Sequence, residues 1–311
     1  MSKDNIVSLI QGFTIELNPK VRFKLDTIPL DTRNHIYITY LPDASENDIL
    51  ETIEFVTNQK LIPIPHLPAR TMKDLNHIKN FLTEIRNRTD SKKILVIGGG
   101  GNQTGEISSS LDILESGLLT EFGFHHIGIA GHPEGSPDIN QETIDQFLNK
   151  KFELSKLKNL NFELVTQFFF NAEPYITWCE KLKSENIDLP VRVGFPGPAS
   201  FKTLLNFGLM SGVGNSLNFL KKNSSKVSDL LTKTSNDEML LGLSNYACSD
   251  SPLKSFHCFP FGGFEKTCMW LNEVQSGSFS LENNKLLAHP QTNSAVDSIP
   301  TLFMTLRSNT S

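Results

Sequence analysis

The sequence predicts an α/β protein, a (β/α)8 TIM barrel with a polar C-terminal extension. Eight short runs of apolar or β-branched residues are separated mostly by segments with helical spacing. Most runs begin 23 to 36 residues after the one before, the length of one strand–helix unit. Successive strands joined by helices pair in parallel, and a count of eight favours a closed barrel over a doubly wound sheet. The eight predicted strands are residues 13–17, 36–40, 61–66, 93–98, 126–130, 162–170, 191–195 and 255–260.

The segments between these runs justify the helices of the barrel. Residues 45–59, 71–88 and 172–186 have the apolar spacing of amphipathic helices. Ser45 and Thr71 are predicted N-caps, because each precedes an aspartate by three residues. The interval before the last strand is longer and holds several helical pieces.

We expect residues 1–275 to form the barrel and residues 276–311 to form the extension. The extension is rich in Ser, Asn and Thr. Two interpretations of it stay open: a surface segment ending in a short edge element at 301–306, or a loosely ordered terminus.

Composition excludes several classes of protein. The chain has 311 residues, 38% of them hydrophobic, and a net charge of −5, so it is globular and lacks the basic surface of a nucleic-acid-binding protein. Neither a signal peptide nor an 18-residue apolar run is present, so no membrane partner is expected. Four cysteines without a CxxC pair predict reduced thiols and a cytoplasmic location. Scattered histidines without an HExxH motif predict no metal site.

Polar and glycine-rich residues follow the predicted strands. The active site of a TIM barrel lies at the C-terminal ends of its strands, so this pattern predicts an enzyme. The seventh strand ends in GFPGPASF and the eighth in HCFPFGG. The residues at the first six strand ends are Glu16, Thr39, His66, Arg70, Gly98 to Gly101, His132, Glu134, Thr166 and Gln167.

Most of these residues also have a purely structural interpretation. Glu16 is suited to proton delivery if it points into the barrel, but the alternation of its strand also allows it to face solvent. His66 lies between prolines, where a structural histidine is common. Gln167 lies in an apolar strand, and its buried amide needs partners from a bound heterocycle or from the backbone.

Two further motifs are ambiguous or excluded. The run GGGGNQTGE matches neither GxGxxG nor a P-loop, and it is either a close approach for a flat ligand or phosphate, or a flexible loop. His257 and Cys258 are neighbours on one strand and point apart, which argues against a Cys–His nucleophile.

Taken in order, these motifs resemble the methylenetetrahydrofolate reductase family. The resemblance rests on FTIE at 13–16, ITY at 38–40, PHL at 65–67, AGHPEGSPD at 130–138, TQFFF at 166–170, GFP at 194–196 followed by SF at 200–201, and FHCF at 256–259. It implies a TIM barrel that uses FAD to pass a hydride from NAD(P)H to 5,10-methylenetetrahydrofolate.

The resemblance also implies roles for individual residues. Glu16 matches the general acid that helps to open the five-membered ring of the substrate. Gln167, Phe201 and Phe259 match substrate-binding positions, the first on the pterin. The positions that match flavin contacts are Thr39, His66, Gly98, His132 and Lys156.

Some positions depart from the family pattern. Gly98, Gly99 and Gly100 stand where the family has Arg-Gly-Asp, and Gly263 where an arginine often meets the folate tail. Three hypotheses therefore stay open. The first is a flavin-dependent reductase that interconverts 5,10-methylenetetrahydrofolate and 5-methyltetrahydrofolate. The second is a flavin-independent tetrahydrofolate enzyme of methyl-group catabolism, and the third is a non-catalytic folate-binding subunit. Each has a tetrahydrofolate derivative as partner, and a homo-oligomer stays open.

Overall fold

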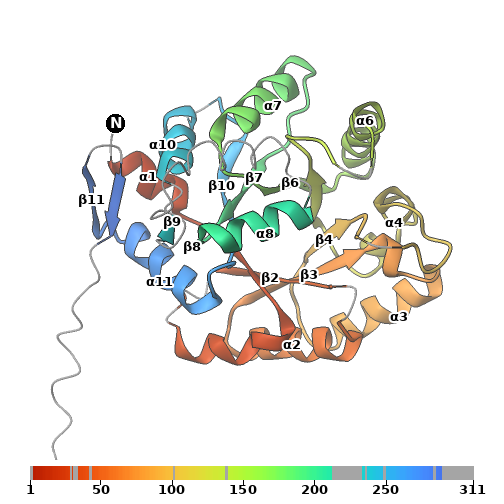
Figure 1. Ribbon diagram of the computed structural model, residues 1–311. Coiled ribbons are helices and arrows are strands. Elements are labelled where there is room, and N and C mark those ends of the chain that lie inside the picture. Colours follow the sequence, from red (N-terminus) through yellow and green to blue (C-terminus); the bar gives the residue numbers. More distant parts are fainter. Residues whose placement is uncertain are drawn as a thin grey trace, which may run out of the picture.

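Eight parallel strands close into a barrel in the computed structural model of the protein (Figure 1). The structure describes residues 3–28, 30, 34–41, 44–100, 102–136, 139–211, 233–234, 237–247, 250–282 and 285–288. The strand order around the barrel is β1-β10-β7-β6-β5-β4-β3-β2, which confirms the predicted fold. The barrel strands are β1 (Thr14–Leu17), β2 (His35–Ile38), β3 (Ile62–Pro68), β4 (Lys93–Ile97), β5 (His126–Gly131), β6 (Asn161–Phe168), β7 (Val191–Pro196) and β10 (Leu253–Phe259).

Helices surround the barrel, and two short antiparallel pairs lie outside its sheet. The α-helices are α1 (Lys3–Ile10), α2 (Glu46–Asn58), α3 (Leu75–Arg86), α4 (Ser110–Glu115), α5 (Leu118–Glu121), α6 (Gln141–Lys158), α7 (Ala172–Ser184), α8 (Phe201–Ser211), α10 (Asp237–Tyr246) and α11 (Phe264–Gln275). The 3-10 helices are η1 (Pro19–Thr27) and η2 (Ala69–Thr71). The antiparallel pairs are β8 (Ala199–Ser200) with β9 (Lys233–Thr234), and β11 (Phe279–Glu282) with β12 (Lys285–Ala288).

One of the two predicted N-caps is confirmed and the other is wrong. The Ser45 side chain accepts the backbone N–H of Asp48 at the start of α2. At α3 the cap is Asp74, which accepts the N–H of His77 at 2.7 Å. Thr71 lies in the preceding 3-10 turn, where its hydroxyl donates to the Pro68 carbonyl and is not available to the helix.

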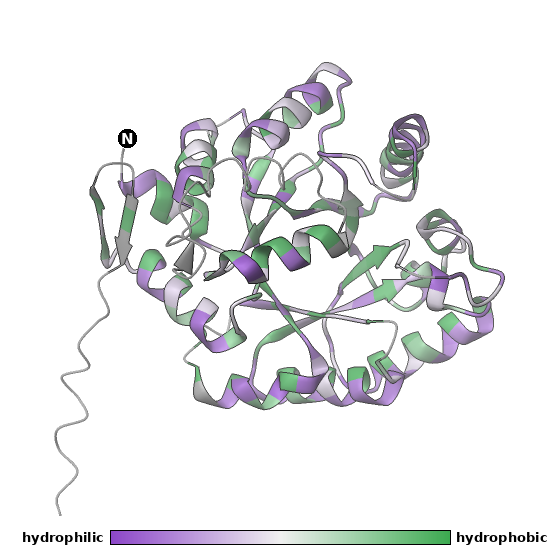
Figure 2. Ribbon diagram, viewed as in Figure 1, coloured by the Kyte–Doolittle hydropathy of each residue, from purple (hydrophilic) through white to green (hydrophobic). Residues whose placement is uncertain are grey.

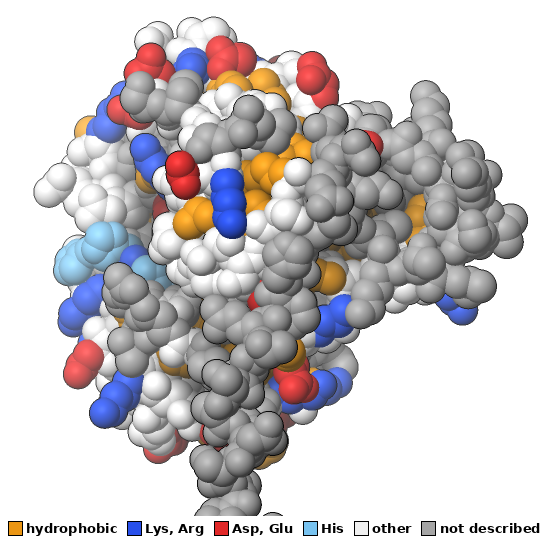
Figure 3. Space-filling model, turned by 90° about the vertical axis from the view of Figure 1, so that its left-hand side faces the viewer, with side chains coloured by type: hydrophobic (Ala, Val, Ile, Leu, Met, Phe, Trp, Pro, Cys, Tyr) orange, Lys and Arg blue, Asp and Glu red, His pale blue; other side chains and the backbone are white. Residues whose placement is uncertain are grey.

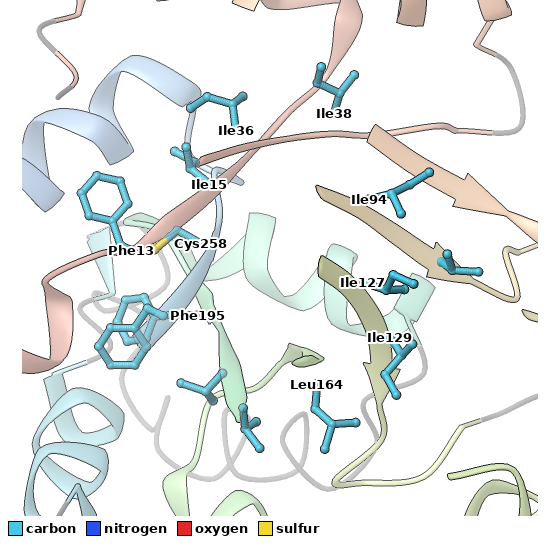
Figure 4. Close-up of a cluster of buried hydrophobic side chains, with 14 of the residues drawn as sticks. Phe13, Ile15, Ile36, Ile38, Ile94, Ile127, Ile129, Leu164, Phe195 and Cys258 are labelled. Carbon is cyan, nitrogen blue, oxygen red and sulfur yellow. The ribbon is translucent and has the colours of Figure 1, made fainter. Parts of the chain in front are cut away.

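The main core lies between the outer face of the barrel and the helices. Every second strand residue points outward, and these positions carry large apolar side chains (Figure 4). The surrounding helices are amphipathic, with hydrophobic residues toward the barrel and hydrophilic residues outside (Figure 2). The outward strand residues include Ile15, Ile36, Ile38, Ile94, Ile127, Ile129, Leu164, Phe195 and Cys258.

A second, small apolar cluster fills the middle of the barrel. It consists of Tyr37, Ile64, Leu95 and Val165, whose side chains point inward. Gly128 contributes space to this layer, since a Cβ there would lie 2.8 Å from Leu95 Cδ1. This layer separates the polar side chains at the C-terminal end of the barrel, its mouth, from those at the N-terminal end, its floor.

Part of the predicted extension packs against the barrel domain. Phe279 of the β11–β12 hairpin is buried in the main core, and the Leu286 N–H donates to the Asp237 carboxylate of α10 at 3.1 Å. The predicted edge element at 301–306 lies outside the described residues. Among the helices of the described part of the chain, none is long and apolar enough to cross a bilayer.

Candidate active site

Glu16 lies at the barrel mouth between two histidines. Its Oε1 is 3.4 Å from His257 Nε2 and 3.9 Å from His66 Nε2. These side chains point inward near the C-terminal ends of β1, β10 and β3. Both imidazole rings contact the Tyr37 ring edge to face, with centroids 4.5 Å apart for His257 and 6.0 Å apart for His66. The predicted Glu16 and His66 are therefore brought together at one point of the mouth.

Hydrogen bonds behind His257 fix how its ring can act. Its Nδ1 is 2.9 Å from the Thr14 hydroxyl, and that hydroxyl donates to the Phe256 carbonyl at 3.4 Å. This contact orients the His257 ring for either ring tautomer. It turns the second ring nitrogen, Nε2, toward the Glu16 carboxyl, so that Thr14, His257 and Glu16 form a chain of polar contacts.

The sequence pattern did not indicate His257 as a partner of Glu16. The Cys258 side chain points outward into the main core, which confirms that the side chains of His257 and Cys258 point apart. The useful signal was alternation: Thr14 and Glu16 share a face of β1, and His257 lies beside Thr14 in the register.

His66 is buried and electrically neutral at neutral pH. Burial lowers its pKa to about 4, the charge of His257 acts in the same direction, and the Glu16 carboxylate opposes them. Its Nε2 has no hydrogen-bond partner within the described residues. A buried imidazole nitrogen without a partner is costly in a folded protein, so this atom is available to a ligand.

An aromatic wall stands beside this polar group. The Phe259 ring contacts the His257 ring edge to face, with centroids 5.0 Å apart. Phe259 also belongs to a cluster of buried, mostly aromatic side chains. The two predicted phenylalanines, Phe201 and Phe259, are both members of it. Through Phe201 and Leu204, α8 packs on the strand ends (Figure 1). The buried members are Phe168, Phe170, Ala199, Phe201, Leu204 and Phe259.

Gln167 is exposed, so the prediction of a buried amide is wrong. A bulge in β6 accompanies this exposure: Val165 pairs with Arg192 and Phe168 with Gly194, so three steps along β6 match two along β7. A Cβ on Gly194 would overlap the Gln167 carbonyl, so only glycine allows the bulged strand to lie this close. The Gln167 Oε1 accepts the Phe168 N–H at 3.1 Å, and the side chain is exposed.

A buried basic pair follows β5. Burial lowers the pKa of Lys151 to about 8, and burial together with the Lys151 charge lowers the pKa of the predicted His132 to about 4. No ion pair or hydrogen bond of the Lys151 ammonium occurs within the described residues. The predicted Lys156 instead lies on the exposed side of α6, where it pairs with Glu153 at 3.1 Å. Lys151 was missed because its burial depends on how α6 packs, which its local sequence does not specify.

Backbone hydrogen bonds to Arg70 hold the loop that begins with the glycine run. The Gly98 carbonyl accepts the Arg70 N–H at 2.9 Å, and the Thr104 N–H donates to the Arg70 carbonyl at 2.9 Å. Gly99 needs to be glycine, because its φ is +83° and a Cβ would lie 2.9 Å from Pro68 Cβ. Beside Gly98 and Gly100, no atom of the described residues lies within 4 Å of where a Cβ would be.

Thr39 is the last of the predicted positions. It is buried beyond the end of β2, and its hydroxyl donates to the Leu17 carbonyl at 3.4 Å. Like Glu16, it lies at the mouth end of the barrel.

Comparison with known proteins gives relatives in one family. No family model matches the chain. It is 26% identical to a 5,10-methylenetetrahydrofolate reductase of Pectobacterium carotovorum subsp. carotovorum over 185 residues, 57% of this chain and 58% of that protein. It is 31% identical to the enzyme of that name from Salmonella typhimurium over 97 residues, 31% of each chain. A methylenetetrahydrofolate reductase 1 of Schizosaccharomyces pombe is 38% identical over 72 residues, 23% of this chain and 11% of that protein. The chain thus spans less than two thirds of the length of these relatives.

Proposed function

Since the chain is a divergent member of the methylenetetrahydrofolate reductase family, we propose that it interconverts 5,10-methylenetetrahydrofolate and 5-methyltetrahydrofolate by hydride transfer. The observation that carries this proposal is the placement of Glu16 between His66 and His257 at the barrel mouth. An acid is needed there because the substrate carbon accepts a hydride only after a carbon–nitrogen bond of the five-membered ring is broken.

Glu16 supplies the proton for ring opening. The proton passes from the Glu16 carboxylic acid to the ring nitrogen, the bond between that nitrogen and the bridging carbon breaks, and the carbon becomes an iminium. Hydride addition then gives the methyl group. His257 orients the Glu16 carboxyl through its Nε2 atom at 3.4 Å, and Thr14 holds the His257 ring in place.

The aromatic wall and Gln167 bind the folate. A pterin is flat and carries donors and acceptors on its edge, so it suits a site that offers phenylalanine rings and an exposed amide. Phe201 and Phe259 supply apolar contact. The exposed Gln167 amide supplies hydrogen bonds that orient the ring.

The mouth has features that fit an FAD. The diphosphate of FAD is anionic, and it would compensate the charge of the buried Lys151, which lies close to His132. The unpartnered His66 Nε2 and the open space beside Gly98 suit the flat ring system. Thr39 is a further mouth position. When bound, FAD would carry the hydride between NAD(P)H and the folate.

One observation favours a second candidate, a tetrahydrofolate enzyme that works without flavin. The open space beside Gly98 and Gly100 replaces the charged residues that the family pattern places there. A site without these charges could admit the hydride donor directly. Glu16 and Gln167 would keep the same roles.

The visible absorption spectrum of the purified protein, with and without added FAD, separates these candidates. The reductase proposal predicts a flavin band that stays with the protein through gel filtration and bleaches when NAD(P)H is added without oxygen. Methylenetetrahydrofolate should then restore the band. A colourless protein that binds no FAD and consumes no NAD(P)H with methylenetetrahydrofolate would contradict both candidates. Tight folate binding in such a protein would indicate a binding subunit.

A further inference from the structure

A cavity of about 110 Å³ opens at the floor of the barrel, at the opposite end from Glu16. Residues at the N-terminal ends of β2, β4, β5 and β6 line it, among them His35, Lys93 and His126. The apolar layer inside the barrel separates it from the mouth. Its residues have no part in the proposed reaction, so an inference about them does not rest on that proposal.

Positive charge at this floor exceeds negative charge. The carboxylate that lines the cavity, Glu163, is bound by Arg192, with 2.6 Å between Nε and Oε1. Arg192 also donates to the Gly12 carbonyl at 2.8 Å, which anchors the pair to the chain before β1. Lys93 makes no hydrogen bond or ion pair with its ammonium group within the described residues. Glu163 acts on it only at longer range, and burial lowers its pKa. Its charge is therefore half-buried and uncompensated, which is unfavourable without a ligand.

Tyr37 adds a buried donor to the cavity. The side chain is 2% exposed and lines the cavity, while its ring contacts the histidines on the mouth side. It lines the cavity together with Glu163, at the floor of the barrel. No hydrogen bond joins its hydroxyl to another described residue. The hydroxyl is therefore a donor that a ligand in the cavity could use.

Histidines complete the donor set. Burial, together with the charges of Lys93, Arg192 and His126, lowers the pKa of His35 to about 4, so its ring is neutral and donates one N–H. His126 and the adjacent His125 are exposed at the rim. On the face shown in Figure 3, histidine side chains gather at one edge close to lysine and arginine side chains.

We propose that the floor cavity binds a small oxyanion of the class of inorganic phosphate, held by Lys93, His35 and the Tyr37 hydroxyl. The Lys93 ammonium, the Tyr37 hydroxyl and one N–H of the His35 ring are donors, so a ligand with several acceptor oxygens satisfies all three. A cation would be repelled by Lys93 and Arg192, and an apolar ligand would leave the donors unpaired. A volume of about 110 Å³ holds several waters or one such anion.

Isothermal titration of the full chain with inorganic phosphate tests this proposal. The wild type should bind one phosphate. Lys93→Gln should abolish binding, and Tyr37→Phe, which removes one hydroxyl, should weaken it about fivefold. Lys92→Gln is the matched control, because Lys92 is adjacent but does not line the cavity, and it should bind as the wild type does.

A second readout keeps the test valid if Lys93→Gln folds poorly. In the NMR spectrum of the wild type, phosphate should shift the His35 ring signals and raise the pH at which they titrate, because a bound anion favours the charged ring. No heat and no His35 shift with phosphate would overturn the proposal. So would binding that survives Lys93→Gln but disappears in Lys151→Met, since the anion would then lie at the mouth.

Discussion

The Glu16 carboxyl and the His257 ring lie 3.4 Å apart, and the His257 ring is held from behind by Thr14. This order of groups means that the Glu16 carboxyl is oriented by His257, and that His257 is in turn oriented by Thr14. A change behind His257 should alter the chemistry without touching the substrate.

Replacing Thr14 by Val tests this arrangement. Without the hydroxyl, the His257 ring loses the hydrogen bond that orients it toward Glu16. We expect kcat to fall about tenfold, equal to about 1.4 kcal/mol in the barrier. Thr14→Ser, which keeps a hydroxyl, should retain most of the wild-type kcat, and Thr83→Val on the exposed side of α3 is the control. An equally low kcat in Thr14→Ser would indicate only a packing role for Thr14.

The stability of the protein should fall in acid because of His66. Its folded pKa of about 4 lies below the ordinary value of 6.5, so between these pH values the unfolded chain binds the extra proton. Stability is then lost as pH falls from 6.5 toward 4, by about 1.4 kcal/mol per pH unit for this group. Urea unfolding, measured at several pH values in this range, should show that the unfolding free energy of His66→Gln falls less steeply with pH than that of the wild type. Equal slopes in the two proteins would be inconsistent with a buried neutral His66.

Lys151→Met should separate stability from cofactor binding. The ammonium of Lys151 is buried, and its pKa is lowered from 10.5 to about 8, so its charge destabilises the folded protein at neutral pH. In the absence of FAD the variant should gain about 3 kcal/mol of unfolding free energy at neutral pH. The wild type should approach it as pH rises from 8 to 10.5.

The same variant should retain less FAD in gel filtration, because the diphosphate loses its buried cation. Lys150→Met, on the exposed side of the same helix, should change neither property. If Lys151→Met bound FAD as tightly as the wild type does, Lys151 would not belong to a flavin site.

Three cysteines should resist alkylation until the protein unfolds. Burial raises the pKa of Cys179 and Cys268 to about 12, and that of Cys258 well above its ordinary value. All three thiols are free and buried, so the reactive thiolate is scarce. Peptide mapping after brief treatment of the native protein with iodoacetamide should find them unmodified. Rapid labelling of Cys258 in the native state would contradict its position in the main core.

The sequence predicted those features that depend on local pattern. Eight apolar runs at regular spacing were sufficient for the barrel, because strand alternation and helical periodicity are local properties. The position of Glu16 followed from the rule that barrel chemistry lies at strand ends. The N-cap of α3 is Asp74 and not the predicted Thr71, because a 3-10 turn that the spacing pattern does not indicate holds Thr71 before the helix begins.

Features that depend on how strands and helices pack could not be predicted from the sequence. The exposure of Gln167 depends on a bulge that the close approach of Gly194 permits. The burial of Lys151 depends on the packing of α6, and the role of His257 on its register with Thr14. Each is a contact between residues far apart in the chain, so no run of neighbouring residues records it.

The formation of 5-methyltetrahydrofolate by the wild type and by Glu16→Gln is the most direct test of the central claim. The reaction would contain 5,10-methylenetetrahydrofolate, NAD(P)H and FAD, with Glu54→Gln on the outer side of α2 as the control. We predict product with the wild type and with Glu54→Gln, and a rate at least about 100-fold lower with Glu16→Gln, as expected for loss of a general acid. Equal rates for the wild type and Glu16→Gln would contradict the account.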